Sequence, residues 1–439
     1  MPIQKTSQKT ILRIAALGLV ALLASCGGKG DKESGGDPKI RLLNLSTGYT
    51  SLDLITNLDE DDDDEDVTQS QAVALESASE YQALKSDTYT IKLKRTGSGS
   101  ILRSFTGEEL VEGTVNTYVA FGEVGAFGAL RIDDTQDDAD AGENKLSIAN
   151  VSTAGALDVY ITDTDTDLDD TTPALSSVGA ALSSFSTDSG TYRLRVTAAG
   201  DNSDVRLDLP AFQLTDKGIG TLILTSSRGG MLVNAVYLPQ EGQPQKFQNT
   251  KARLRGAVAL ANGAAATIAA GGKSLLTAAT AGVIGSRYLL LDAGAVPVTL
   301  TVNGTAVAVP DVSLQAGADY TLMTYSGATV QTSLILDDNR LPSSATHTKL
   351  RLLNGMSTLG APLNLSMDFS PVIEGTLLGQ VSDPVEVASG TDHQFDVTNN
   401  STAALVLTRT SITLQPNSVY TFFLTDNGAT AIGVPRRDR

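Results

Sequence analysis

The sequence predicts an all-β protein built from tandem antiparallel β-sandwich domains of the immunoglobulin-like kind. In many short segments apolar residues alternate with polar ones, which places the apolar set on one face of a strand. Gly, Asn, Asp and Ser separate these segments at intervals of about ten residues, as in β-sandwiches. A pattern of strands also recurs with a period of roughly 100 residues, the size of a small domain. Helical periodicity is scarce, and we expect one short helix at most, over residues 70–84.

The N-terminus begins with a basic segment that contains Lys5, Lys9 and Arg13, followed by an apolar run over residues 14–23. This run suits a signal peptide and is too short to span a bilayer alone. It ends in the sequence Leu-Ala-Ser before Cys26, which resembles the lipobox of bacterial lipoproteins. The resemblance implies cleavage before Cys26, a lipid on its thiol and acylation of the new amino terminus.

Cys26 is the only cysteine of the chain. An ordinary secretory signal with an incidental cysteine would leave a lone exported thiol without explanation. Gly27, rather than Asp, follows Cys26, and the resemblance therefore implies transport to the outer membrane. We expect residues 1–25 to be the signal peptide and residues 26–38 to be a lipidated flexible tether, so that the membrane is contacted through the lipid.

The composition is that of an acidic exported protein. Fifty acidic residues face 32 basic ones, for a formal charge of −18, which becomes −21 once the three basic residues of the leader are removed. Such a surface repels nucleic acid and anionic membranes, so nucleic acid is excluded as a partner. No later segment has the run of about 18 apolar residues that a transmembrane helix needs.

Four copies of one pattern follow. The first opens with Lys-Ile-Arg-Leu-Leu-Asn at residues 39–44, the second with Lys-Leu-Ser-Ile-Ala-Asn at 145–150 and the fourth with Lys-Leu-Arg-Leu-Leu-Asn at 349–354. A Leu-x-Leu or Leu-x-Val strand comes next, in which Asp53 corresponds to Asp158. Each copy closes with two apolar runs around a Gly-containing turn, which predicts a hairpin. The predicted domains are repeat 1 at 39–143, repeat 2 at 144–248, a degenerate repeat 3 at 249–344 and repeat 4 at 345–439.

This opening motif resembles the DUF4397 family, over Lys39 to roughly Arg436. The resemblance implies exported bacterial proteins of tandem β-sandwich repeats with no assigned activity. Repeat 3 lacks both the Asn and the Asp, so its assignment rests on spacing and on its closing hairpin.

The sequence offers no catalytic residue. His347 and His393 are the only histidines and lie in different segments, and neither a nucleophile elbow nor a phosphate-binding loop is present. The chain has no Trp, and Tyr89, Tyr192 and Tyr320 fall at apolar strand positions, which favours core packing over sugar stacking.

Carboxylates are the one abundant functional group. Asp163, Asp165, Asp167 and Asp169 follow a strand of repeat 2, and the acidic run 59–66 follows the corresponding strand of repeat 1. Ca²⁺ takes six to eight oxygen ligands, so the four aspartates are a candidate calcium site, although the loop lacks the Gly and Glu of an EF-hand. The alternative is a solvated acidic loop that prevents edge-to-edge pairing of strands.

The sequence therefore predicts a non-enzymatic, lipid-anchored cell-envelope protein that acts as a structural and interaction module, with an unidentified protein or glycan partner. A calcium- or glycan-binding adhesin-like module is the alternative. A glycosidase-type enzyme with paired carboxylates is the least favoured interpretation. The sequence lacks the long insertion in one repeat that a catalytic cleft usually needs. Apart from the candidate Ca²⁺, no cofactor is implied.

Overall fold

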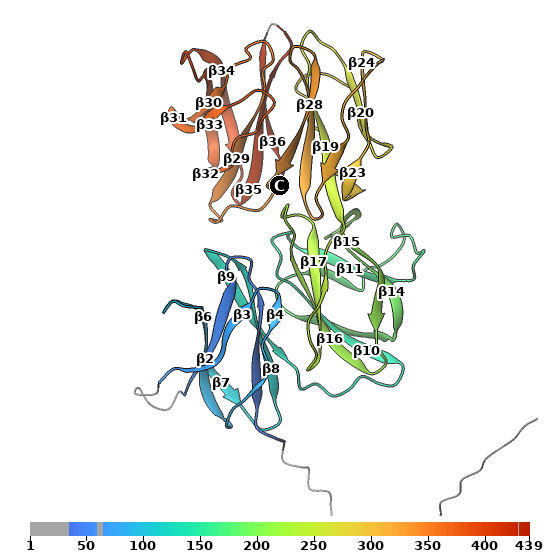
Figure 1. The fold of residues 1–439 in the computed structure, drawn as a ribbon, viewed down its shortest axis with the longest axis vertical. Coiled ribbons are helices and arrows are strands. Elements are labelled where there is room, and N and C mark those ends of the chain that lie inside the picture. Colours follow the sequence, from blue (N-terminus) through green and yellow to red (C-terminus); the bar gives the residue numbers. More distant parts are fainter. Residues whose placement is uncertain (1–34, 59–64, 429) are drawn as a thin grey trace, which may run out of the picture.

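The computed structural model describes residues 35–58, 65–428 and 430–439, and these contain strands and turns but no helix. The all-β prediction is confirmed, and Figure 1 shows the strands gathered into sandwiches that are arranged two by two. Cys26 lies outside the described residues. We call the four sandwiches units 1 to 4 in chain order.

The strands of each unit follow one another without interruption. Unit 1 comprises β1 (Lys39–Leu45), β2 (Ser51–Leu58), β3 (Val67–Ala74), β4 (Ser77–Ala78), β5 (Gln82–Ala83), β6 (Asp87–Arg95), β7 (Ile101–Leu110), β8 (Val115–Glu123) and β9 (Ala126–Asp133). Unit 2 comprises β10 (Glu143–Asn150), β11 (Leu157–Thr162), β12 (Leu175–Val178), β13 (Ser183–Asp188), β14 (Gly190–Ala198), β15 (Asp201–Leu214), β16 (Gly218–Ser226), β17 (Val233–Pro239) and β18 (Gln245–Phe247).

The second half of the chain repeats this series. Unit 3 comprises β19 (Lys251–Ala259), β20 (Ala266–Ala270), β21 (Lys273–Ala279), β22 (Leu289–Asp292), β23 (Gly294–Val296), β24 (Val298–Val302), β25 (Thr305–Val307), β26 (Val312–Leu314), β27 (Asp319–Ser326) and β28 (Val330–Asp337). Unit 4 comprises β29 (His347–Gly355), β30 (Leu363–Met367), β31 (Ser370–Thr376), β32 (Val385–Ala388), β33 (Gly390–Asn399), β34 (Leu405–Leu414), β35 (Ser418–Asp426) and β36 (Ala431–Arg437).

All four units share one strand order. An outer sheet is built as β3-β2-β6-β7 in unit 1, and as β12-β11-β14-β15, β21-β20-β24-β25 and β31-β30-β33-β34 in the others. An inner sheet holds the opening strand and the closing hairpin, as in β4-β1-β8-β9 and β32-β29-β35-β36. The inner sheets are not purely antiparallel, because the opening strand pairs in parallel with the first strand of the closing hairpin (β1 with β8, β10 with β16, β19 with β27, β29 with β35). Parallel pairing needs a long crossover, which the outer sheet supplies.

In units 1, 3 and 4 the chain enters and leaves the inner sheet at the same end. In unit 1 the start of β1 pairs with the start of β8, as Lys39 with Val115, and the end of β9 pairs there too, as Asp133 with Asn116. Units 3 and 4 repeat this, with Asp337 opposite Asp319 and Arg437 opposite Tyr420.

The predicted helix over residues 70–84 is wrong. This segment forms β3, β4 and β5, and β3 pairs with β2 as an edge strand. Ala72 has a φ of 53°, and its amide donates to the Asp53 carboxylate at 2.8 Å, so a bulge interrupts the strand there. The corresponding segments of the other units, β12, β21 and β31, are edge strands as well, so the sheet context decides this structure over local propensity.

Unit 3 departs from the others where a proline interrupts the long hairpin that ends the outer sheet. Pro297 stands between β23 and β24, and the partner strand is likewise divided into β25 and β26. Proline has no amide to donate to a ladder and therefore breaks it. The terminal pair Gly294–Leu314 still matches Gly190–Leu214 of unit 2.

Each inner sheet is buried on both faces, because the units pack in pairs. Leu42 of unit 1 points into its own core, whereas the adjacent Leu43 joins Val119, Ile223 and Val236 in a cluster between units 1 and 2. Between units 3 and 4 the equivalent cluster includes Ala257, Met323, Leu353 and Phe423. Gly355 is required here, since a Cβ atom at this position would lie 2.5 Å from that of Ala259. The pairing is therefore made by apolar cores and not by loose surface contact.

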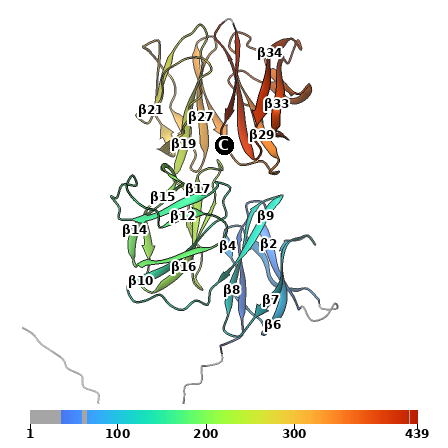
Figure 2. The same ribbon diagram turned by 180° about the vertical axis from the view of Figure 1, so that it is seen from behind.

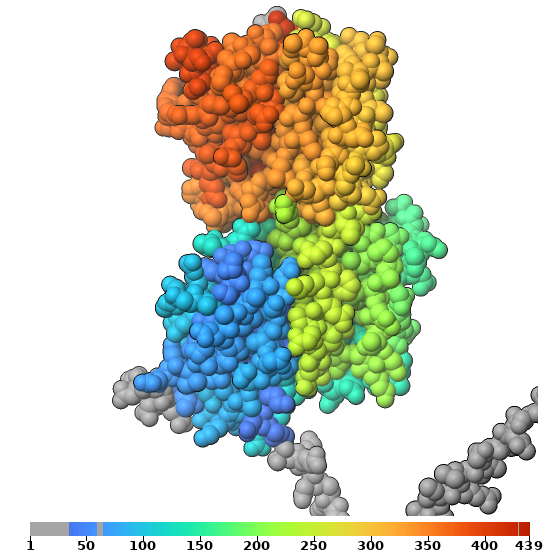
Figure 3. All heavy atoms as spheres, in the orientation of Figure 1, coloured from blue at the N-terminus to red at the C-terminus, as the bar shows by residue number. Residues whose placement is uncertain are grey.

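The two pairs stack end to end, as Figures 1 and 2 show from opposite sides. The short strand β18 runs back along β17 and brings the chain to the end of unit 2 that meets unit 3. Ser227 Oγ and the Gly229 amide there both donate to the Gly317 carbonyl, each at 2.8 Å. Across the same junction Arg340 of the segment after β28 pairs with Glu123 of unit 1 at 3.5 Å. In Figure 3 the pair of units 3 and 4 forms one continuous mass of atoms that rests on units 1 and 2.

Candidate functional site

The repeated asparagine of the opening motif serves the fold. Asn44 Nδ2 donates to the Val73 carbonyl at 3.0 Å, and its Oδ1 accepts from the Ser46 amide at 3.0 Å. Asn150 and Asn354 make the same bonds in units 2 and 4, to Val178 and Thr376. Each asparagine is buried and fastens the end of the inner strand to the outer edge strand. None of the three presents a free polar group to a ligand.

The repeated aspartate also acts within the fold. Asp53 accepts from the Ala72 amide, Asp158 accepts from the Ser177 amide at 2.8 Å, and Asn364 accepts from the Gly375 amide at 2.8 Å. Each of these donors has a positive φ. The side chain thus stabilises a left-handed bulge in the edge strand, and in unit 3 Thr267 performs the same task for Ala278.

A buried arginine recurs in three units and was not recognised from the sequence. Arg41, Arg255 and Arg351 lie at one position of the opening strand, and each donates through Nε to a threonine of the closing hairpin: Thr117, Thr321 and Thr421. That threonine donates in turn to an aspartate at the end of the hairpin: Asp134, Asp337 and Asp438. Unit 2 has Ser147 at this position. The signal was present, because an arginine in a strand of otherwise buried residues needs a buried partner.

In units 3 and 4 the arginine of each unit also pairs with the aspartate of the other unit. Arg255 of unit 3 donates to Asp438 of unit 4 at 2.5 Å, and Arg351 of unit 4 pairs with Asp337 of unit 3 at 2.9 Å. Burial opposes ionisation of Asp337, but Arg351 and Arg255 outweigh it and hold the pKa of Asp337 below its usual value. Buried ion pairs between the two units therefore add to the apolar contact between them.

In unit 1 the corresponding arginine and aspartate are farther apart, and their attraction is weaker. Arg41 lies 3.8 Å from Asp134 and donates to the Gly242 carbonyl of unit 2 at 2.6 Å. Burial raises the pKa of Asp134, despite hydrogen bonds from Thr117 and Tyr81. One arginine at this distance does not offset the loss of solvation, whereas two arginines do so for Asp337.

The candidate calcium residues do not converge. Asp163, Asp165, Asp167 and Asp169 are all exposed, and within the loop Asp167 Oδ1 accepts from the Asp169 amide at 3.3 Å. The loop is held by its carbonyl groups, which accept from Arg193, Arg195 and Asn202. In the part of the chain that the structure describes, no three His, Cys, Asp or Glu side chains are placed to hold a metal ion. The calcium site stays a prediction from sequence.

The other residues singled out from sequence have local roles. Most of the acidic run 59–66 lies outside the described residues, but Asp66 pairs with Lys92 at 2.6 Å and also with Lys94. His393 Nδ1 lies 2.7 Å from Asp368, and no hydroxyl or thiol contact completes a triad there among the described hydrogen bonds. Of the tyrosines, Tyr89 and Tyr320 are buried in the cores, and Tyr192 is partly buried against its own.

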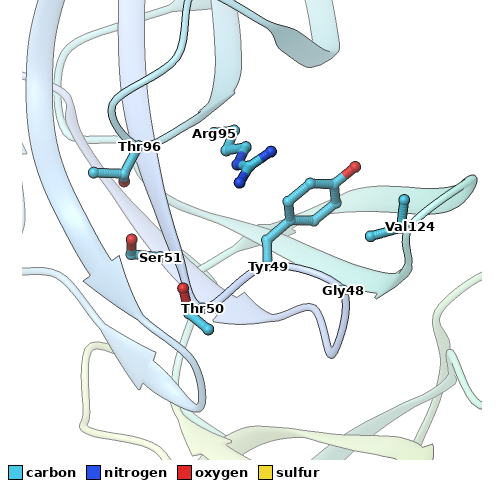
Figure 4. A pocket seen from close by; sticks show the side chains of 7 residues that line it. All are labelled: Gly48, Tyr49, Thr50, Ser51, Arg95, Thr96 and Val124. Atoms are coloured by element: carbon cyan, nitrogen blue, oxygen red, sulfur yellow. The ribbon is translucent and has the colours of Figure 1, made fainter.

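The described surface has several open hollows. One of about 350 Å³ opens at the junction end of unit 1, where Figure 4 shows Tyr49 and Arg95 reaching in from two different segments. Tyr49 packs edge-on against Phe127 at 5.6 Å between ring centroids, so its ring belongs partly to the core. A hollow of about 610 Å³ lies where all four units meet, and one of about 430 Å³ lies beside units 2, 3 and 4. Among the described hydrogen bonds, no nucleophilic side chain lining these hollows is bonded to a side chain that could act as its base.

No helix among the described residues is long and apolar enough to cross a membrane. The fold and the contacts above are those of a packed assembly of sandwiches.

Comparison with known proteins identifies one domain. Residues 38–160 match the family described as Domain of unknown function (DUF4397), a match that covers unit 1, β10 and most of β11. No curated protein matches the chain.

Among solved structures, one match is a crystal structure of a family CBM26 module from Eubacterium rectale Amy13K in complex with maltoheptaose. It is 10% identical, covers 43% of this chain and 92% of the other, and has a TM-score of 0.15. A likeness at this level carries no argument about fold or ligand.

Proposed function

We propose that this chain, whose first unit carries the DUF4397 match, is a non-enzymatic, lipid-anchored protein of the cell envelope that acts as a rigid spacer and interaction module. One observation carries the proposal: contacts of the kind found inside domains join the units in pairs, and loop contacts stack the two pairs end to end. Apolar clusters join the units in pairs, and the buried ion pairs of Arg255 and Arg351 add to the contact between units 3 and 4.

The course of the chain supports the role of a spacer. Unit 1 begins at the end of the molecule that faces away from the junction, where the Lys39 amide donates to Thr114 at 2.9 Å. Glu123, at the other end of β8, meets Arg340 at the junction. An anchor at the N-terminus would therefore hold one pole of the stack and leave units 3 and 4 at the opposite pole.

The repeated polar residues support a non-catalytic role. In the described units the Asn, Asp and Arg positions of the repeat are occupied by bonds within the fold. A catalytic site needs polar groups that the fold leaves available to a substrate. The surface of the assembled units is therefore the part of the molecule that a partner meets.

Rigidity is tested by the distance between spin labels on two distant units. Ser104 of β7 and Thr410 of β34 are exposed and lie in equivalent strands of units 1 and 4. With Cys26 replaced, S104C and T410C provide the two label sites in the full-length chain. We expect a single narrow distance distribution from pulsed electron paramagnetic resonance. A broad or multiple distribution would show independent units and contradict the spacer.

The anchor is tested by changing Cys26 to Ala in the producing cell. We expect the variant to carry no lipid and to move from the membrane fraction to the soluble fraction. Ser25→Ala is the matched control, because a small residue remains before the cysteine, and it should stay in the membrane fraction. Membrane association of Cys26→Ala equal to that of the unchanged chain would refute lipid anchoring.

A further inference from the structure

The hollow of about 430 Å³ beside the junction is lined by six arginines and only three aspartates. This is an unusual concentration of positive charge for a chain with a formal charge of −18. Its walls come from β15 of unit 2, from β19 and the segment before β22 in unit 3, and from the end of β36 in unit 4. The hollow therefore forms only where units 2, 3 and 4 meet in the assembled chain.

The inner arginines form a fixed floor. Arg206 pairs with Asp204 at 2.5 Å, and Arg253 makes a bidentate bond to Asp319 at 2.7 and 2.8 Å. The ring of Tyr288 lies 4.6 Å from the Arg253 guanidinium and 4.7 Å from that of Arg255. Stacking of this kind holds guanidinium groups in place without neutralising them.

The outer arginines lack such partners. Arg287, Arg436 and Arg437 line the mouth, and no ion pair of theirs is seen among the described residues. Arg436 Nη2 donates to the Ser286 carbonyl at 3.1 Å, and Arg437 Nε donates to the Arg439 carbonyl at 3.0 Å. Asp201 is the one carboxylate of the lining that the floor arginines do not pair with, and it accepts from Ser203 at 2.6 Å. The mouth therefore holds a surplus of two positive charges.

Three arginines of the lining have an unsatisfied donor, and the Arg439 side chain lies close enough to two lining arginines to be repelled by them. Arg206 Nε, Arg255 Nη2 and Arg436 Nε have no hydrogen-bond partner among the described residues, and the first two side chains are only 5% and 2% exposed. Burial and the neighbouring Arg206 and Arg253 also lower the pKa of Arg439 to about 10. Buried positive charges that repel one another are stabilised by an anion.

We propose that this arginine-lined hollow is a binding site for a doubly charged oxyanion, a phosphate group either free or as the ester of a small molecule. A phosphate ester carries a charge of about −1.5 to −2 at pH 7, which matches the surplus at the mouth. Arginine is the side chain best suited to it, because its planar fork donates to two oxygens at once. The hollow is within the size range of about 300–1,000 Å³ of small-molecule sites.

The site is tested by calorimetric titration of the full-length chain in detergent at constant ionic strength. The probes are glucose 6-phosphate, inorganic phosphate, glucuronate and glucose. We expect saturable binding of glucose 6-phosphate, weaker binding of the singly charged glucuronate and no binding of glucose. Comparable affinity for inorganic phosphate would assign the site to the free anion, and a clear preference for glucose 6-phosphate would assign it to an ester.

The variants locate the binding. Arg287→Gln, alone and combined with Arg436→Gln, should weaken binding by about tenfold or more, since a charge-assisted hydrogen bond is lost. Arg409→Gln is the matched control, because Arg409 is exposed on β34 and far along the chain from the hollow. An unchanged thermal transition of Arg287→Gln excludes loss of folding. Absence of saturable binding by both phosphate probes, or equal affinity in Arg287→Gln and Arg409→Gln, would overturn the proposal.

Discussion

At the scale of single residues, the same buried series of arginine, threonine and aspartate occurs in units 1, 3 and 4. Arg41, Arg255 and Arg351 each contact a threonine and an aspartate, but their electrostatic balance differs. Asp337 lies between two guanidinium groups and has a lowered pKa, whereas burial raises the pKa of Asp134. The ion pairing is thus strong between units 3 and 4 and weak in unit 1.

This difference predicts unequal costs for one chemical change. Asp337→Asn leaves Arg255 and Arg351 short of a buried counter-charge, and we expect a loss of about 3–5 kcal/mol in the free energy of unfolding. Asp134→Asn should cost about 1–2 kcal/mol, as for a buried hydrogen bond, because its carboxylate is already disfavoured by burial. Urea unfolding of the two variants measures both losses. Equal losses would show that the ion pairs between units 3 and 4 add nothing beyond hydrogen bonding.

The residues of the repeat were found from sequence, but their purpose was not. Matching Asn44 with Asn150 and Asp53 with Asp158 marked positions that the fold needs, and the structure places all four in backbone contacts. The arginine-lined hollow was not predictable, because its residues come from three units and meet only after these have stacked.

At the scale of elements, local signals were reliable where partners are close in the sequence. The closing hairpins β8–β9, β16–β17, β27–β28 and β35–β36 all form as their Gly-containing turns predict. The parallel pairs were missed, since no local pattern distinguishes them and the strands of the outer sheet separate β1 from β8 in the sequence. The edge strand β3 was mistaken for a helix because its bulge interrupts strict alternation.

One turn has backbone strain that glycine would relieve, because residues other than glycine adopt its left-handed conformation. Between β30 and β31, Asp368 and Phe369 both have positive φ, of 49° and 68°, and Phe369 is 79% exposed. A residue other than Gly pays about 1–2 kcal/mol for the left-handed conformation. The ring gains little in return, because most of it is in contact with solvent.

Phe369→Gly should therefore stabilise the chain by about 0.5–1 kcal/mol, after allowance for the greater freedom of glycine in the unfolded state. The midpoint of urea unfolding measures this gain. Phe369→Ala is the control, because it removes the ring and keeps the backbone penalty, so its stability should be unchanged. A gain in Phe369→Ala equal to that in Phe369→Gly would attribute the effect to the exposed ring.

At the scale of the whole molecule, the pairing of units had a signal in the sequence. Leu42 and Leu43, like Leu352 and Leu353, are adjacent apolar residues in one strand, and adjacent positions point to opposite faces. In the structure one member of each couple enters the core of its unit and the other enters the contact between units. Strands buried on both faces are expected to read as continuous apolar runs.

The stacking of the pairs had no comparable signal. It rests on a few loop contacts, such as Gly229 with Gly317, and on β18, a strand of three residues that no periodicity can reveal. The lipid at Cys26 remains a prediction, because Cys26 and most of the predicted tether lie outside the described residues.

The position of the chain ends in each sandwich also bears on how such a protein grows by gene duplication. Because β1 begins and β9 ends at the same end of unit 1, a second copy of the coding segment needs only a short loop to lie beside the first. A further pair on top of it requires the chain to travel the length of a sandwich, and β18 provides that passage. Two sandwiches and a returning strand are therefore the smallest insertion that lengthens the stack and leaves the contacts of the existing copies in place.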